Sequence, residues 1–424
     1  MALISQRNAK MFAKLGGAGY TVSPASPTSP LGIGSSPDQS IWEVPILAGF
    51  SFGQTTNSTE VTVNEAGFTS RRARVLFNDS LAPVEFSFST YIRPTAGGTP
   101  NKVVAPEQVL WAMLMGADSY NSTSGKFYSS LIANNSSAGI VSPTYAPIDA
   151  AAVNSGTTTA TVDTYDLSAS NISYYPGGNS IIFQVQEGSS YEVFSIENAQ
   201  IGSVTIDFDI EGICTAQWTG MGTKIIRSTT AVTGANRVGV DTTTNFIRNK
   251  LSTLALSSYR DPDTASPAAS GGSPGEDSYS IVLTGGSFTI ENNLNFLIPE
   301  VVGTVNQAVG NITGARTISG NLTCYYDTDT GSSKSAELWD DLIKGNSGSP
   351  SVGTTIPDIR NAHNMTINIG GSTGSRLVLN LPTAHFEIPT INPDELFTLE
   401  ANFHAVPSQG NFDATNEVTV SYAI

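Results

Sequence analysis

Positively charged residues are scarce in this chain. Its 424 residues include 20 Lys and Arg against 36 Asp and Glu, which gives a formal net charge of −16. Proteins that bind nucleic acids through the phosphates need clustered Lys and Arg. The composition therefore excludes a protein that holds nucleic acid tightly by its backbone.

Cysteine and histidine are also rare, with 2 and 3 residues respectively. Cys214 and Cys324 each lie within an apolar segment, and two cysteines make no disulfide framework, so we interpret both as buried hydrophobic side chains. His363, His385 and His404 have no metal-ligand spacing among themselves or with the cysteines. No glycine-rich phosphate loop follows a predicted strand. We therefore expect no metal site and no cofactor.

Long hydrophobic runs are absent as well. No segment reaches the length of a membrane helix, and residues 1–20 contain Arg7, Lys10 and Lys14 but lack the apolar core of a secretory signal. The sequence thus predicts a chain that folds in a cytoplasm and has no membrane partner.

The chain is instead rich in Ser, Thr, Asn and Gly, while charged residues make up only 13%. This composition is typical of a mainly β protein with many turns, and the length leaves room for two or three domains. We interpret residues 1–40 as a poorly ordered or docked N-terminal arm and expect regular structure from Ile41 onward. Alternation is clearest at 84–93, where Phe86 and Phe88 face one side and Ser87 and Ser89 the other. Further strands are predicted at 41–47, 50–52, 58–63, 180–185, 203–217, 246–256, 287–294, 314–326, 365–369, 376–381, 395–406 and 417–422.

Two short helices are predicted between these strands. The first covers 106–115, with Pro106 at its start and Gly116 at its end. The second covers 335–343, where Leu338 and Leu342 fall on one side, with Ser335 as its cap and Gly345 as its stop.

The stretch from Ser287 to Ile343 carries a family resemblance. It begins with Ser-Phe-Thr-Ile-Glu-Asn-Asn-Leu at 287–294. A long loop leads to Thr-Gly-Ala-Arg-Thr-Ile-Ser-Gly-Asn-Leu-Thr-Cys-Tyr-Tyr at 313–326, and the second helix follows. This order of elements resembles the tail tube proteins of long-tailed bacteriophages. The resemblance implies a tail-tube-type β-sandwich or half-barrel and a structural function in the virion tail.

The two halves of the chain can be laid over one another. Strand, loop and strand at 58–93 match 287–326, the helix around Trp111 matches that around Trp339, and 208–212 match 397–401. We therefore predict two tandem tail-tube domains, each with a short helix. Their boundaries are 41–225, with an insertion around 117–175, and 226–424. The alternative is a coincidence of the kind that β-sandwiches produce freely.

This duplication predicts how the chain assembles. A hexagonal ring needs six sandwiches, so three chains suffice, as a homotrimeric, pseudo-hexameric ring. The resemblance implies that rings stack into a hollow tube for genome ejection, in contact with tape-measure, distal tail and tail-terminator proteins, while genomic DNA passes without specific binding. It also implies that the loops 64–80 and 297–311 reach the next ring, through Arg71, Arg72, Arg74, Pro299, Glu300 and Asn306. The alternative for both loops is an ordinary surface loop.

One predicted strand carries a stripe of acidic residues. A period of two places Asp207, Asp209 and Glu211 on one face of it, with Ile206, Phe208 and Ile210 on the other. Three carboxylates on one face are tolerable only in water. They suit a tube bore that repels phosphate, with Glu400 as the counterpart in the second half, and they suit a solvated outer face equally well.

The sequence gives little support for an enzymatic function. The segment Gly345-Asn346-Ser347-Gly348 resembles a protease nucleophile loop, but every histidine follows Ser347 instead of preceding it, and no strand–turn–helix elbow is present. The acidic run Asp327 to Gly331 resembles a calcium loop but has Leu338 where the closing Glu belongs, so we expect a β-turn. We predict no enzyme. The remaining alternative is another virion or surface β-protein, such as a decoration or adhesin module.

Overall fold

The computed structural model describes residues 6–16, 41–61, 75–96, 103–117, 119–121, 126–128, 161–166, 178–237, 239–241, 245–258, 278–298, 308, 310–329, 334–344, 363–393, 395–406 and 417–424. These residues form a mainly β protein with antiparallel sheets, which confirms the predicted fold class. No helix in the described ranges is long and apolar enough to cross a membrane.

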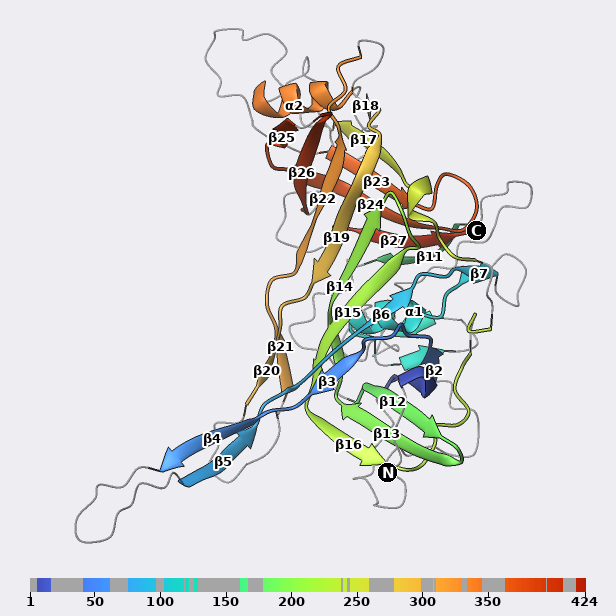
Figure 1. Ribbon diagram of the computed structural model, residues 1–424, viewed down its shortest axis with the longest axis vertical. Helices are drawn as coiled ribbons and strands as arrows, with labels where there is room; N and C mark the ends of the chain where they lie inside the picture. Colours follow the sequence, from blue (N-terminus) through green and yellow to red (C-terminus); the bar gives the residue numbers. More distant parts are fainter. Residues whose placement is uncertain are drawn as a thin grey trace, which may run out of the picture.

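One large antiparallel sheet of fourteen strands runs along the molecule (Figure 1). Its main order is β18-β17-β23-β24-β26-β22-β19-β14-β15-β6-β3, while β25 pairs with β26, and β27 pairs with β24 and β11. The bounds in that order are Ser278–Tyr279, Thr253–Ser258, His363–Ile369, Arg376–Phe386, Phe397–Ala405, Thr317–Tyr325, Leu283–Glu291, Gln200–Asp209, Thr215–Gly222, Val84–Tyr91 and Ser51–Gly53, then β25 Thr390–Pro393, β27 Thr419–Ala423 and β11 Thr161–Asp166. The sheet is continuous across the two halves of the sequence because β14 pairs with β19 over seven residue pairs, from Ser203↔Glu291 to Asp209↔Gly285.

A second sheet packs beside the first, in the order β16-β13-β12-β1-β2. Its strands are Lys224–Ser228, Ser190–Glu197, Ser180–Glu187, Ala9–Lys14 and Ile41–Val44. β1 contradicts the expectation that regular structure begins at Ile41. Met11 lies opposite both Phe183 and Val44, and Met11, Phe12 and Ala13 are buried. Both faces of β1 are covered, so its sequence does not alternate, and the strand is held in place by its two neighbours.

Four two-stranded ribbons complete the β structure of the described residues. β4 (Thr56–Val61) pairs with β5 (Val75–Leu81), and β20 (Leu294–Leu297) pairs with β21 (Gly310–Thr313). The two small ribbons are β7 Thr95–Ala96 with β8 Val103–Val104, and β9 Ser119–Asn121 with β10 Lys126–Tyr128. The loop predicted at 64–80 is thus wrong from residue 75 onward, since β5 occupies that part.

Both predicted helices are present. α1 (Gln108–Leu114) is buried along its whole length, and Gly116 follows it with φ +85°, a conformation that glycine adopts without strain. α2 is Ser335–Lys344, and short 3-10 turns occur at Gln6–Asn8 and Asn249–Leu251. Ser335 is not the N-cap of α2, since its hydroxyl accepts from the Asp327 N–H and donates to the Tyr325 carbonyl, joining the helix to the end of β22.

The core lies between the large sheet, the small sheet and α1. The indole rings of Trp111 on α1 and Trp218 on β15 meet edge to face with centroids 5.0 Å apart. Cys214 and Cys324 are buried free thiols in this core, as predicted, and burial raises the pKa of both, that of Cys324 to about 11.

Candidate functional surface

The face of the large sheet that points away from the core is a broad polar surface. It spans eight neighbouring strands, β3, β6, β15, β14, β19, β22, β26 and β25, which we call the wall strands. Residues directly opposite each other on antiparallel strands point to the same face. Asp207, Ser287, Asn321 and Asn402 are successive partners across four wall strands. A parallel row runs through Asp209, Gly285, Thr323 and Glu400, so the two halves of the chain contribute to one surface.

Short hydroxyl and amide contacts link the wall strands along this polar face. Oxygen–oxygen distances are 2.9 Å for Ser51–Ser87, 2.6 Å for Ser203–Thr219, 3.1 Å for Thr205–Thr289 and 2.8 Å for Ser287–Asn321. The Asp209 Oδ1 and Thr323 Oγ1 atoms both lie close to the position that a Cβ atom on Gly285 would take, at 3.0 and 3.2 Å from it. Polar side chains that hydrogen-bond to one another in this way make the surface hydrophilic and restrict its conformation.

The polar face carries negative charge and no Lys or Arg. The only Asp, Glu, Lys and Arg residues in the wall strands are Glu85, Asp207, Asp209, Glu291 and Glu400, and all lie on this face. Partial burial, and then the neighbouring charge of Asp209, raise the pKa of Asp207. Sequence reasoning missed Glu85 and Glu291, although the same alternation around Phe86 and Ile290 places them here.

The predicted acidic stripe is shorter in the structure than in the sequence. β14 ends at Asp209, and Glu211 lies in the turn that leads through Gly212, whose φ is +103°, into β15. Ile210, predicted to share a strand face with Ile206 and Phe208, follows the end of β14 and is 45% exposed. The prediction failed because 203–217 was read as one strand, whereas β14 and β15 form a hairpin there.

Two of the three histidines lie side by side, and one of them, His404, lies on this face opposite Ser319. His385 on β24 is the direct partner of His404 on β26, and His404 Nε2 lies 3.5 Å from Glu387 Oε1. His363 on β23 is buried against the ring of Phe386 instead. Within the described ranges, no three His, Cys, Asp or Glu side chains are placed to hold a metal ion. Asp327 accepts from the Asp329 N–H, a local turn contact, and Ser347 lies outside the described residues.

Two ribbons extend the wall strands beyond one end of the sheet. We call β4–β5 the first arm and β20–β21 the second arm; α2 lies at the top of the view in Figure 1, the first arm at the far end from it and the second arm between β19 and the first arm. Every residue of β4 is exposed, and so are Val75, Leu76 and Phe77 at 59, 60 and 51%. The proposed contacts Arg71, Arg72, Arg74, Pro299, Glu300 and Asn306 belong to the sequences that link the strands of the two arms and lie outside the described residues.

Buried and half-buried polar contacts fix the base of each arm. Gln54 Nε2 donates to the carbonyls of Ala82 (2.9 Å) and Thr223 (3.1 Å) at the first arm. At the second arm, Asn292 Nδ2 donates to the Leu114 carbonyl (2.7 Å) at the end of α1. Asn292 Oδ1 accepts from Arg316 Nε at 3.1 Å.

The same network extends to the C-terminal strand. Arg316 Nη1 lies 3.3 Å from Glu417 Oε2, and both side chains are nearly buried. Asn292 and Arg316 belong to the two segments on which the family resemblance rests. These segments therefore set the direction of the second arm relative to the body.

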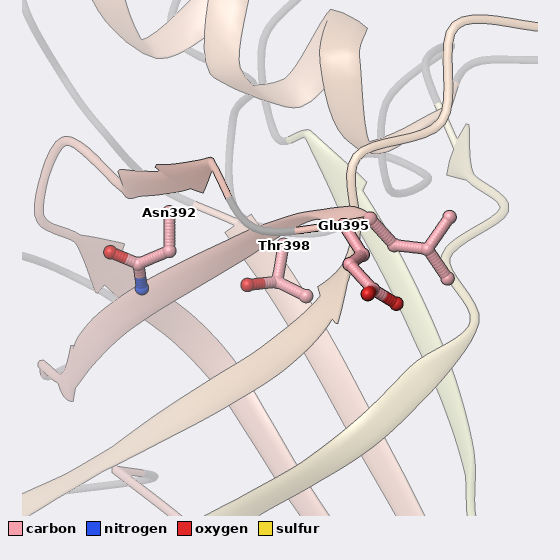
Figure 2. A pocket seen from close by; sticks show the side chains of 4 residues that line it. Asn392, Glu395 and Thr398 are labelled. Carbon is pink, nitrogen blue, oxygen red and sulfur yellow. The ribbon is translucent and has the colours of Figure 1, made fainter.

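The end of the wall strands near α2 is hollowed, and several exposed apolar side chains lie there beside polar ones. A hollow of about 510 Å³ is lined by Asn392, Glu395, Leu396 and Thr398, and Figure 2 shows how these side chains project from β25, β26 and the residues between them. A second hollow of about 290 Å³ is lined by residues that include Val282, Tyr325 and Asp327. Val282, Tyr325, Leu396 and Phe397 are 45 to 68% exposed at this end, and we call them the end patch.

The subunit has a wide, continuous sheet with one hydrated face, two projecting arms and an end patch of exposed apolar side chains. These features are typical of a structural protein that associates with other copies of itself. Comparison with known proteins identifies it further, because the sequence matches the phage tail tube protein family over residues 84–405, and the chain belongs to that family. It is 30% identical over 386 residues to the tail tube protein pb6 of Escherichia phage T5, an alignment that covers 88% of this chain and 69% of pb6.

Membership of this family has direct consequences. The protein is a structural component of the virion tail that self-assembles into a tube, and its family is not a known class of enzyme. The recognition made from residues 287–343 is thereby confirmed. The alternative of a decoration or adhesin module is not supported.

Proposed function

We propose that three copies of this chain close a ring and that their wall strands form the inner wall of the tube. The support is a repeated order of elements. β3, the first arm, β6 and α1 follow one another in the first half as β19, the second arm, β22 and α2 do in the second. In the sheet, β3-β6-β15-β14 is followed by β19-β22-β26-β25, the same arrangement twice. By this order β26 corresponds to β15, and not to β14 as the sequence match of 208–212 with 397–401 implied.

Neighbouring chains would pair in the same way as the two domains of one chain pair with each other. Within one chain the last strand of the first unit, β14, pairs with the first strand of the second unit, β19. The equivalent edges, β25 and β3, have no further partner on the described path of the sheet. Pairing of β25 with β3 of the next chain closes the wall after three chains and removes both exposed edges. The two domains would be 41–225 and 226–424, with the first extended to Ser228 because β16 pairs with β13.

The polar face of this wall would line the bore. Glu85, Asp207, Asp209, Glu291 and Glu400, with Glu211 at the strand end, then repeat around each ring as an acidic surface. Every contact with a DNA phosphate is repulsive there, so DNA passes during genome ejection without dwelling. No catalytic role is proposed for any residue.

The arms would join one ring to the next. Their linking sequences bring Arg71, Arg72 and Arg74 on the first arm and Pro299, Glu300 and Asn306 on the second to this contact. At the tube ends and inside it we propose distal tail, tail-terminator and tape-measure proteins as partners, by analogy with the family.

Electron microscopy of the concentrated protein, with rotational averaging of end-on views, tests this proposal. We expect hollow tubes whose rings have threefold symmetry. Sixfold rings built from one domain per chain would overturn the duplication, and protein that remains monomeric together with its natural tail partners would overturn the tube function.

The assignment of the acidic residues to the bore has a separate test. The double variant Asp207→Lys with Asp209→Lys should leave tubes intact but reduce infectivity. Asp241→Lys with Asp329→Lys, outside the wall strands, is the matched control, and unchanged infectivity of the first variant would contradict the bore assignment.

A further inference from the structure

Arg376 is a buried positive charge. It is the first residue of β24, and only 6% of it is exposed. Its Nη1 donates to the Gly374 carbonyl at 3.1 Å, and within the part of the chain that the structure describes the guanidinium has no further hydrogen bond and no ion pair. Burial lowers the pKa of this guanidinium, which nevertheless keeps its charge. Proteins bury charges in pairs because an isolated buried charge is costly, so Arg376 lacks the anion that a buried guanidinium requires.

The β23–β24 turn, which precedes this arginine, has few side chains and is open to solvent. Its sequence is Gly-Gly-Ser-Thr-Gly-Ser, and the φ angles of Gly370, Gly371 and Gly374 are all positive, between 82 and 108°. Ser372 and Thr373 are exposed, and a Cβ atom on Gly374 would meet open space. Backbone that carries no side chain can bring its N–H groups close to an anion, and Ser and Thr hydroxyls add further donors.

Two more buried polar atoms lack partners beside this turn. A Cβ atom on Gly371 would lie 3.2 Å from the Leu251 carbonyl oxygen, so the turn packs against the 3-10 turn Asn249–Leu251. In the described ranges, the Asn249 Oδ1 and Ser252 Oγ atoms at that 3-10 turn are buried without a hydrogen-bond partner. Buried polar groups in native proteins nearly always have one. The Ser252 hydroxyl can donate to an anion, and water held by the anion can donate to Asn249 Oδ1.

We propose that Arg376 and the β23–β24 turn bind a small oxyanion of the phosphate class. The planar guanidinium pairs with two oxygens of such an anion at once, and the donors of the turn reach the remaining oxygens. The net charge of −16 on the chain repels large polyanions, which favours a small ion that reaches a single site. β24 is not one of the wall strands, so this site is separate from the polar face and does not depend on the proposed tube.

Thermal unfolding of the full, unassembled chain in sodium phosphate and in sodium chloride of equal ionic strength tests the site. We expect phosphate to raise the unfolding temperature in a saturable way, by about 2 °C at a tenfold excess over the dissociation constant. Arg376→Met, which keeps the packing of the apolar stem, should abolish this rise. Arg248→Met is the matched control, since Arg248 is exposed beside the same 3-10 turn and should retain the rise. No saturable rise in the natural chain, or an equal rise in Arg376→Met, would overturn the proposal.

Stability in the absence of phosphate provides an independent test. Because the charge of Arg376 has no partner in the chain, Arg376→Met should unfold in chloride at the same temperature as the natural chain or at a higher one. A large fall would show that the guanidinium already has a partner, against the proposal. Equilibrium dialysis with radiolabelled phosphate should find a single phosphate per chain before and after assembly. Binding that is lost on assembly would mean that a carboxylate of a second copy occupies the site, and would overturn the assignment to a free anion.

Discussion

The indole nitrogen of Trp111 donates a buried hydrogen bond of 2.6 Å to the hydroxyl of Tyr422, a residue 311 positions further along the chain. Trp111 lies on α1 and Tyr422 on β27, so this bond joins the first half of the sequence to its last strand. The same hydroxyl hydrogen-bonds to the buried carboxyl of Glu107. The three side chains form a polar network inside an apolar core.

Removing the Tyr422 hydroxyl should therefore destabilise the whole chain. Tyr422→Phe takes the acceptor from the Trp111 N–H in a buried site, which costs about 1–3 kcal/mol. Urea unfolding of the unassembled chain measures this loss. Tyr325→Phe, at a tyrosine that is 45% exposed, should change the free energy of unfolding little, and an equal loss in both variants would contradict this role.

Glu107 should make the chain less stable as the pH rises. Burial raises the pKa of Glu107 to about 7, against hydrogen bonds that include the Arg93 N–H at 3.2 Å. Between about pH 4.5 and 7 the unfolded chain has released this proton and the folded chain has not, so stability falls by up to about 3 kcal/mol as pH increases through that window. Glu107→Gln should abolish this loss. An unaltered pH profile in that variant would show that another group titrates.

His363 should act in the opposite direction. Burial, and then the charge of His385, lower the pKa of His363 to about 4. Between about pH 6.5 and 4, His363 is protonated in the unfolded chain but neutral in the folded chain. The free energy of unfolding therefore falls as the pH decreases from 6.5 to 4. The buried Nδ1 has no hydrogen-bond partner, and the ring meets Phe386 edge to face at 5.2 Å. His363→Phe should keep the packing and remove the acid sensitivity.

These two groups partly cancel in the natural chain between about pH 4.5 and 6.5. The cancellation is itself testable, because Glu107→Gln should expose a steep loss of stability below pH 6.5. The double variant with His363→Phe should be nearly flat. A flat profile for Glu107→Gln alone would contradict the assignment to His363.

Local patterns in the sequence predicted single elements well. Phe86 and Phe88 lie in the core and Ser87 and Ser89 on the polar face, because the period of two belongs to one strand and needs no knowledge of its neighbours. α1 was also predicted closely, from Pro106 before it and Gly116 after it.

Features that depend on distant neighbours were not predictable. β1 is a strand only because β12 and β2 enclose it, and β5 is a strand only because β4 pairs with it in an arm that the body does not cover. The sequence likewise could not place Glu400 in the same cross-strand row as Asp209. That relationship depends on the order β14-β19-β22-β26, which is a property of the whole sheet.

A close contact of glycine with phenylalanine recurs in the wall and leads to the last prediction. Gly220, Gly286 and Gly320 are the direct cross-strand partners of Phe86, Phe208 and Phe403. In each pair the ring lies over the glycine, where a Cβ atom would collide with it. The glycines thus leave room for aromatic rings of the core to pack directly against the backbone of the neighbouring strand.

Gly320→Ala should therefore destabilise the chain by about 1–3 kcal/mol, since the added Cβ would overlap the Ser287 carbonyl oxygen and the Phe403 ring. Gly310→Ala on β21 is the matched control, because a Cβ there meets open space and the change should be close to neutral. Thermal unfolding of both variants measures the difference. A combined Gly320→Ala and Phe403→Leu variant should recover part of the loss, since the smaller side chain frees the space that the new methyl group needs. No recovery would mean that the Ser287 carbonyl, and not the ring, sets the requirement for glycine.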